Sequence, residues 1–268
     1  MINKLTALFK KGKDIHPPLK ENGKNTTSIA FISLHKCATS FFSRTVLKEL
    51  KELALVNYQS YEYLHEEKIA PIIKPEGYIY AVLRLYDRDH PGYKLTNELI
   101  NPSNLKKIKT IFWVRDPRDI LVSLYYSFGF THPESPNQII KAHQHQRREK
   151  IQKMSLDEYA LNEAPNLQWK FEQIDNLREQ LPDHLFMRYE EMIHNFDPFF
   201  QTLSDFTGLD KNLYKQMYQQ TRPNESEDTS KHKRSGKTQA YLEKLKPETI
   251  EMLNSILAPT LEKFGYVV

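Results

Sequence analysis

The stretch "IAFISLHKCATSFFSRTVLKEL", residues 29–50, joins two kinds of hydrophobic pattern through a short polar turn. Residues 29–34 are apolar and β-forming, which predicts a buried strand. From residue 39 onward the apolar residues recur at the spacing of a helix face, which predicts a helix. The turn between them, "HKCATS" (35–40), contains one lysine and two hydroxyls but no glycine. The sequence therefore predicts a strand, a tight turn and a helix whose first amides face the turn and can bind an anion.

The same alternation continues along the chain. Further strands are predicted at residues 78–85, 109–115 and 184–189. Helices are predicted at residues 39–53, 117–128, 155–161, 167–181, 196–208 and 247–265. Two polar stretches, residues 129–154 and 222–240, are predicted to be long loops of the kind that form lids or binding segments. Strands that alternate with helices predict a three-layer α/β fold with a central parallel β-sheet flanked by helices.

Composition limits the class of protein. The 268 residues carry a net charge of +4, which is too small to indicate nucleic acid but fits a small polyanionic ligand. The single cysteine, Cys37, excludes an intramolecular disulfide and a cysteine-built metal site. No apolar run approaches the roughly 20 residues of a membrane span, and the charged start is unlike a signal peptide, so a cytoplasmic protein is expected. Residues 1–27 are predicted to be a polar lead-in to a single domain, residues 28–268.

The turn at 35–40 fits several kinds of site. A Walker A loop is excluded because residues 29–50 contain no glycine. A cysteine phosphatase loop would use Cys37, since a thiol beside a lysine at a helix start has a lowered pKa. Its arginine should follow after five residues, whereas Arg44 follows after six. A capping role for Thr39 or Ser40 also fits the turn taken alone.

A second stretch, "IFWVRDPRDILVSLYYSF" (111–128), favours an anion-binding function. Arg115 ends a predicted strand, and Asp116 and Pro117 suit the cap and the first turn of the next helix. Ser123 follows two helical turns later. Arg115 and Ser123 could therefore reach the same phosphate group.

These segments together resemble the sulfotransferase family, which uses 3′-phosphoadenosine 5′-phosphosulfate (PAPS). The family's first motif, close to P-K-[ST]-G-T-[TS]-[WF], is matched at Lys36, Thr39, Ser40 and Phe41, and the chain departs from it at His35, Cys37 and Ala38. The second, strand-R-[ND]-P-x-D-x-x-x-S-x-[YF], is matched at Arg115, Asp116, Pro117, Asp119, Ser123 and Tyr125. The stretches "LFMRYEEMIHNFDPFFQTLSDFTGL" (185–209) and "KRSGKTQAY" (233–241) are similar to the third and fourth.

The resemblance implies a P-loop-like nucleotide-binding core and assigns residues to the donor. The 5′-phosphosulfate would be cradled by Lys36, Cys37, Ala38, Thr39, Ser40 and Phe41. The 3′-phosphate would be held by Arg115 and Ser123, with Arg234, Ser235 and Gly236 closing over it, and Tyr189 would lie near the adenine. Alanine replaces the family's glycine at position 38, and it should fit this role only if the turn keeps φ negative there.

The reaction implied is in-line transfer of a sulfonate group from PAPS to an acceptor hydroxyl or amine, releasing 3′,5′-ADP without a metal. Lys36 would neutralise charge on the leaving oxygen. The family's usual base histidine has no counterpart after residues 78–85, and His90 is the predicted base. Other candidates for the base are Arg84, Asp87, His132 and Glu134. His143 and His145 are expected to be solvated rather than metal ligands.

The resemblance also implies the partners. The acceptor is expected to be a small molecule or a glycan that bears a hydroxyl, and a homodimer is left open. Two alternatives remain. One is a protein that binds PAPS or 3′,5′-ADP without turnover, and the other is a Cys37-dependent phosphatase.

Overall fold

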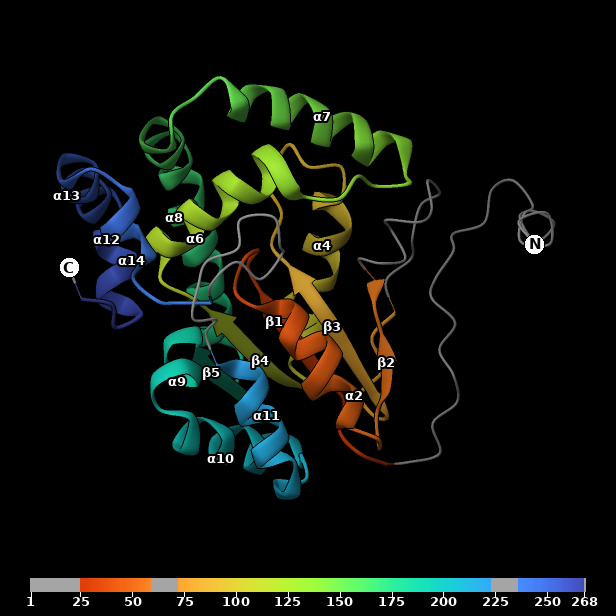
Figure 1. Cartoon of the computed structure of the whole chain (residues 1–268). Coiled ribbons are helices and arrows are strands. Elements are labelled where there is room, and N and C mark those ends of the chain that lie inside the picture. The colour runs from red at the N-terminus through yellow and green to blue at the C-terminus, as the bar shows by residue number, and fades with distance from the viewer. Residues whose placement is uncertain (1–24, 59–71, 223–235, 268) are drawn as a thin grey trace, which may run out of the picture.

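The computed structural model describes residues 25–58, 72–222 and 236–267, and Figure 1 shows their arrangement. Of the predicted lead-in, only residues 25–27 belong to this described part. A sheet lies at the centre, with helices on both of its faces.

The sheet contains five parallel strands in the order β2-β3-β1-β4-β5. The strands are β1 Ile29–Ser33, β2 Ala54–Val56, β3 Tyr78–Arg84, β4 Lys109–Val114 and β5 His184–Arg188. Strand β1 is the central one, and all five of its residues are buried. A strand buried on both faces is expected to be continuously apolar, which is the pattern that predicted it. The predicted three-layer α/β class is confirmed.

Strand β2 was not predicted from the sequence. The helix predicted over residues 39–53 ends early, and residues 54–56 then pair with β3. The strand is three residues long, and only Val56 is buried, so it gives no periodic signal. Its place at the edge of the sheet is set by pairing with β3 rather than by its own pattern.

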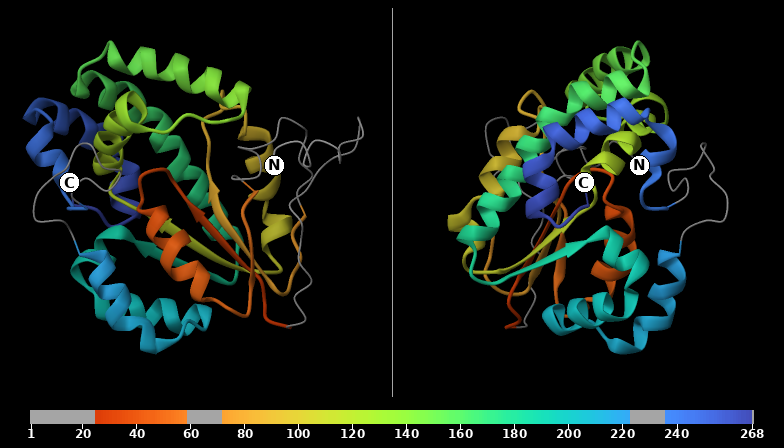
Figure 2. Two further views of the ribbon diagram at one scale, coloured as in Figure 1. Left: turned by 45° about the vertical axis from the view of Figure 1, so that its right-hand side comes forward. Right: turned by 90° about the vertical axis from the view of Figure 1, so that its left-hand side faces the viewer.

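The helices cover both faces. They are α1 Thr39–Phe41, η3 Phe42–Val46, α2 Leu47–Glu49, α4 Tyr93–Leu99, α5 Pro102–Leu105, α6 Pro117–Tyr126, η4 Ser127–Thr131, α7 Gln138–Gln152, α8 Leu156–Gln180, α9 Tyr189–His194, α10 Phe196–Thr207, η5 Lys211–Leu213, α11 Tyr214–Thr221, α12 Ala240–Lys244, α13 Pro247–Ile256 and α14 Ala258–Lys263. Helices α4 and α8 lie on one face, and α2 and α11 lie on the other (Figure 2). Helices α6 and α7 lie above the carboxyl ends of the strands (Figure 1).

Two predictions about helices were wrong. Residues 155–161 and 167–181 form one helix, α8, which continues through Pro165. Its buried face includes residues on both sides of that proline, and a capping box formed by Ser155 and Glu158 starts it. The predicted helix 247–265 is interrupted at Leu257, where α13 ends and α14 begins.

The predicted loop 129–154 is also wrong, because most of it is helix α7. Only Ile140 and Ile151 of this helix are buried, so its apolar pattern is weak. Polar contacts hold it instead: Arg148 donates to the carbonyl of His132 at 2.6 Å and Gln152 to that of Gly129 at 2.8 Å. Such contacts between distant residues leave no periodic signal in a sequence.

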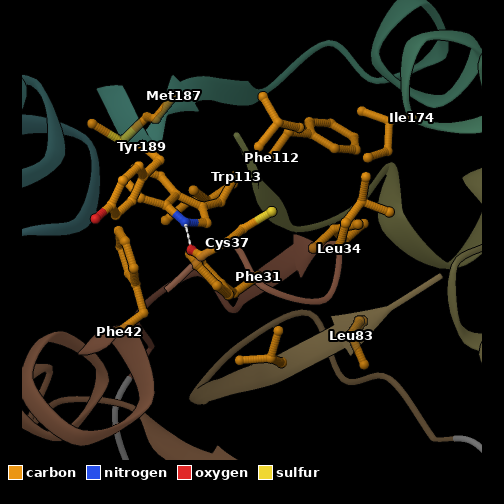
Figure 3. Close-up of a cluster of buried hydrophobic side chains, with 14 of the residues drawn as sticks. Phe31, Leu34, Cys37, Phe42, Leu83, Phe112, Trp113, Ile174, Met187 and Tyr189 are labelled. Atoms are coloured by element: carbon orange, nitrogen blue, oxygen red, sulfur yellow. Dashed lines mark hydrogen bonds between the residues drawn. The ribbon is translucent and has the colours of Figure 1, made fainter. Parts of the chain in front are cut away.

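The core extends to the turn that follows β1 (Figure 3). The ring of Phe42 lies 4.5 Å, centroid to centroid, from Phe31 and also 4.5 Å from Trp113. The indole Nε1 of Trp113 donates to the carbonyl of Cys37. A fully buried side chain of the core therefore fixes the backbone of the polar turn.

Candidate active site

The turn after β1 has an unusual backbone. Lys36 has φ of 68° and Ala38 has φ of 55°, so both residues are left-handed. The condition of a negative φ at Ala38 is therefore not met. The left-handed conformation costs a residue with a Cβ about 1–2 kcal/mol. The hydrogen bond from Trp113 and the complete burial of Cys37 hold the turn in this shape, which leads directly into α1.

The side chain of Cys37 is enclosed in the hydrophobic core. Its side chain is fully buried, and its Sγ lies 3.7 Å from the carbonyl oxygen of His35. Burial raises the pKa of the thiol to about 12, so the thiolate that a phosphatase needs does not form near neutral pH. The geometry therefore argues against the phosphatase alternative.

Arg115 is held beside this turn at the carboxyl end of β4. Its Nη1 donates to the carbonyl of Lys36 at 3.3 Å, and its Nη2 donates to Asp119 at 3.2 Å and to the carbonyl of Lys237 at 2.9 Å. Its guanidinium lies 4.7 Å from the ring centroid of Tyr189. The Nε is buried and has no hydrogen-bond partner among the described residues. A buried N–H group without a hydrogen-bond partner is costly, which indicates that the site is prepared for a hydrogen-bond acceptor of a ligand.

Asp119 connects Arg115 to the chain that precedes α12. Its carboxylate accepts hydrogen bonds from the backbone N–H of Gln239 at 2.9 Å and of Tyr241 at 3.1 Å, as well as from Arg115. The side chain is fully buried. The sequence matched this aspartate to a motif but gave it no role. Its spacing of four residues from Arg115, on the turn that opens α6, was the available signal.

The structure brings together several residues that were predicted to bind the sulfonate donor. The hydroxyl of Tyr189 donates to the carbonyl of Gly236, and the ring of Tyr189 packs against Arg115. Ser123 is buried on α6, the helix that begins two residues after Arg115. Arg234 and Ser235 lie outside the described residues.

A second group of side chains lies on the other side of the turn, around His35. The ring centroid of His35 is 5.8 Å from that of Tyr86 and 5.4 Å from that of Phe128. Burial, together with the nearby cations Arg84 and Lys170, lowers the pKa of His35 well below its usual value. The imidazole is therefore neutral at pH 7. Sequence reasoning missed His35, because it appeared there only as a departure from the family motif.

Asp87, a candidate base, is the centre of a buried ion network. It accepts hydrogen bonds from Arg147 at 2.7 Å and from Asn166 at 2.6 Å, and it pairs with Lys170. Burial opposes ionisation, but Lys170 and Arg147 outweigh it and hold the pKa of Asp87 well below its usual value. A carboxylate held this strongly ionised is a poor proton acceptor.

His90, the predicted base, is stacked on Tyr86 with ring centroids 3.8 Å apart. Its Nδ1 accepts a hydrogen bond from the backbone N–H of Gly92 at 2.9 Å. In this arrangement the neutral ring carries its proton on Nε2 and has no free lone pair. Burial and the neighbouring His143 lower the pKa of His90 to about 3. The geometry therefore does not favour His90 as the base.

The remaining candidates lie on the loop before α7 and at the end of β3. Glu134 is exposed and pairs with Lys141 at 2.7 Å and with His145 at 3.0 Å. His132 packs edge-on against Phe128, with centroids 5.1 Å apart. Arg84 donates to the hydroxyl of Thr39 at 2.9 Å and so joins the end of β3 to the start of α1.

Glu190 gives the site a pH-dependent contribution to stability. Its Oε1 accepts the backbone N–H of Asp116 at 3.0 Å, and burial raises its pKa to about 7. The pKa of a glutamate in the unfolded chain is about 4.3. At pH values between this pKa and 7, Glu190 is therefore more protonated in the folded protein than in the unfolded chain. The free energy of unfolding should therefore fall as pH rises through 7. Glu190→Gln keeps the acceptor for Asp116, so we expect it to be more stable than wild type by about 1–3 kcal/mol at pH 8.

Urea unfolding at pH 5, 6, 7 and 8 measures this effect. The difference between Glu190→Gln and wild type should grow with pH, whereas Glu262→Gln, an exposed change on α14, should follow wild type throughout. Parallel pH profiles for Glu190→Gln and wild type would show that Glu190 does not titrate in this range.

Comparison with known proteins agrees with this geometry. The family model described as "Sulfotransferase domain" matches residues 27–265. This chain belongs to the sulfotransferase family. The match includes the turn after β1, Arg115 and the C-terminal helices. The resemblance inferred from the motifs is confirmed.

Two solved structures are similar to this chain at low sequence identity. One is a mouse sulfotransferase, SULT7A1, complexed with PAP, at 14% identity, with 90% of this chain and 85% of that chain covered and a TM-score of 0.46. Another is retinol dehydratase in a complex with retinol and PAP, at 11% identity, with 90% and 82% covered and a TM-score of 0.50. No curated protein matched the sulfotransferase chain.

Two features are absent from the part of this sulfotransferase that the structure describes. No helix within residues 25–58, 72–222 and 236–267 is long and apolar enough to cross a membrane. In the same part of the chain, no three His, Cys, Asp or Glu side chains are grouped as a metal site. Metal independence of the reaction stays a prediction.

Proposed function

We propose that this sulfotransferase uses PAPS as its donor and transfers the sulfonate group to an acceptor hydroxyl, releasing 3′,5′-ADP. The observation that carries the proposal is Arg115, whose buried Nε has no partner among the described residues. Its other two nitrogens are fixed by Asp119 and by backbone carbonyls, so the guanidinium is held ready for a phosphate. PAP, present in both structural neighbours, is the 3′,5′-ADP that remains when PAPS has lost its sulfonate.

The two anionic ends of the donor have separate binding groups. Arg115 and Ser123 would hold the 3′-phosphate. The turn that leads into the helix starting at Thr39 would hold the 5′-phosphosulfate at the positive end of that helix. Lys36 would place its ammonium against the oxygen that leaves with the 5′-phosphate. Arg234, Ser235, Gly236 and Tyr189 keep their proposed roles around the nucleotide.

Transfer requires one bond to form and one to break. The acceptor oxygen bonds to sulfur, the bond from sulfur to the bridging oxygen breaks, and the acceptor proton passes to a base. We assign the base to His35, which directly precedes Lys36. Burial keeps its ring neutral, and its ring nitrogens make no hydrogen bond to other described residues. A neutral imidazole with a free lone pair can accept the proton.

A comparison of two histidine variants tests the assignment of the base. With PAPS and an acceptor that supports wild-type turnover, His35→Ala should lower kcat about a hundredfold. His90→Ala should stay within about threefold of wild type, because its lone pair is engaged by Gly92. Affinity for 3′,5′-ADP should be unchanged in both variants. A larger loss of kcat in His90→Ala than in His35→Ala would return the role to His90.

Donor binding is tested without an acceptor. A thermal-shift assay should show stabilisation by 3′,5′-ADP well beyond that by AMP or by the isomer 2′,5′-ADP. Arg115→Ala should remove most of this difference, because its partner is the 3′-phosphate. Equal shifts for all three nucleotides would reject the proposed donor. Binding of 3′,5′-ADP without any transfer from PAPS would instead support the alternative of a non-catalytic binding protein.

Three further predictions complete the proposal. Residues 28–268 would act as a single catalytic domain. The chain would work in the cytoplasm, and its acceptor would be a small molecule or a glycan. A homodimer is left open.

A further inference from the structure

A pocket of about 290 Å³ lies between α4 and α8, on the face of the sheet opposite α2. This volume is near the lower end of the ~300–1,000 Å³ typical of small-molecule sites. The described residues that line it include no Asp, Glu, Lys, Arg or His. Charged residues make up 27% of the whole chain, so a neutral lining is a distinct local property.

The lining comes from one face of each helix. Helix α8 contributes Trp169, Gln173, Asn176, Leu177 and Gln180, and the segment of α4 contributes Tyr93, Thr96, Asn97 and Ile100. These residues recur at the spacing of a helix face, at which core contacts are normally apolar. The buried members of this lining are Thr96, Ile100 and Leu177, whereas the amides Asn97, Asn176 and Gln180 are exposed. The two facing helices therefore form a hollow that is largely apolar where it is buried and carries amides where it is exposed.

The walls combine aromatic rings with free amides. Tyr93 and Trp169 lie with their ring centroids 6.3 Å apart, and Arg88 lies 4.5 Å from the ring centroid of Trp169. In the described part of the chain, the side chains of Asn97, Gln173 and Asn176 make no hydrogen bond. Each amide offers both donors and an acceptor to a ligand.

We propose that this pocket binds a neutral sugar ring of the acceptor, an inference that rests on the proposed sulfonate transfer. A pyranose ring has an apolar C–H face that packs on aromatic rings and an edge of hydroxyls that both donate and accept. Aromatic walls and amides without a hydrogen bond to other described residues match these two surfaces, and a neutral ring needs no charged partner among the lining residues.

Tyr86 connects the pocket to the transfer centre. It lines the pocket, its ring stacks on His90, and its centroid is 5.8 Å from that of His35, which precedes Lys36. A sugar unit held between α4 and α8 would therefore lie on the acceptor side of the turn. The pocket would select the acceptor and leave the donor site unchanged.

The test uses the full chain on an array of neutral oligosaccharides, with uronic-acid-containing and sulfated oligosaccharides as the charged comparison. The best neutral binder is then titrated against Gln173→Leu and Trp169→Ala. We expect both variants to weaken its affinity about tenfold or more and to raise KM with kcat within about threefold. The matched control is Gln201→Leu, an exposed change on α10, which should behave as wild type. Binding of 3′,5′-ADP, measured in each variant, shows that the fold and the donor site are intact.

The possible results separate the sugar-binding inference from the proposed function. Neutral binding that depends on Gln173 and Trp169 supports the inference. No neutral binding, or binding unaffected by either variant, in a protein that still binds 3′,5′-ADP overturns the inference and leaves the proposed function standing. Sugar binding that depends on Gln173, in a protein that binds neither 3′,5′-ADP nor PAPS, would keep the pocket as a sugar site and reject the proposed function.

Discussion

Lys36→Ala is expected to lower the turnover of PAPS about a thousandfold, while 3′,5′-ADP still binds within about tenfold of wild type. The reason is that charge develops on the bridging oxygen only as the bond to sulfur breaks. Removal of the cation therefore costs the transition state more than the bound product. The substitution keeps a Cβ at position 36, so it adds no backbone strain at φ of 68°.

Cys37→Ala is the neighbouring comparison for this prediction. The Cys37 side chain is fully buried with a pKa of about 12, so its loss should change kcat by less than about threefold. Release of 3′,5′-ADP from PAPS, followed by chromatography, measures both variants. A cysteine variant that loses turnover, beside a lysine variant that keeps it, would reverse the assignment.

Asp87→Asn is expected to lower the free energy of unfolding by about 3–5 kcal/mol. Asparagine has nearly the same shape but leaves Lys170 and Arg147 buried without a counter-charge. The Lys170 side chain is only 7% exposed and that of Asp87 is 12% exposed, so solvent cannot replace the lost interaction. Urea unfolding at pH 7 measures the change.

Two controls separate this effect from a general loss of charge. Asp89→Asn, two residues away on a side chain that is 83% exposed, should change stability by less than about 0.5 kcal/mol. The double variant Asp87→Asn, Lys170→Met should recover part of the loss, because it also removes one unpaired cation. If Asp87→Asn stays within about 1 kcal/mol of wild type, the network is not the stabilising unit that its geometry indicates.

The sequence predicted the fold well where structure depends on local pattern. The continuous apolar runs of β1 and β4 and the cap formed by Asp116 and Pro117 are local features, and all are present in the structure. The segment that became α7 gave no such signal, because a polar helix is held by contacts with residues far away in the chain. The pairing that makes residues 54–56 a strand is likewise visible only in three dimensions.

Some residues of the candidate site were indicated by local sequence motifs, whereas others are placed only by tertiary packing. The motifs indicated Lys36 and Arg115, and the structure places these two in contact through the Lys36 carbonyl. The motif gave no base, and His90 was chosen by its position in the chain. Its hydrogen bond from Gly92 and the placement of His35 between Tyr86 and Phe128 depend on tertiary packing. The left-handed Ala38 follows from packing too, since Trp113 fixes the backbone next to it.

A crystal structure of the protein with 3′,5′-ADP would show directly whether the proposed residues hold the nucleotide. We expect the 3′-phosphate to contact Arg115, including its Nε, and Ser123, and the 5′-phosphate to lie on the turn between Lys36 and Phe41. Density for the nucleotide at another place, or a 3′-phosphate with no contact to Arg115, would contradict this expectation.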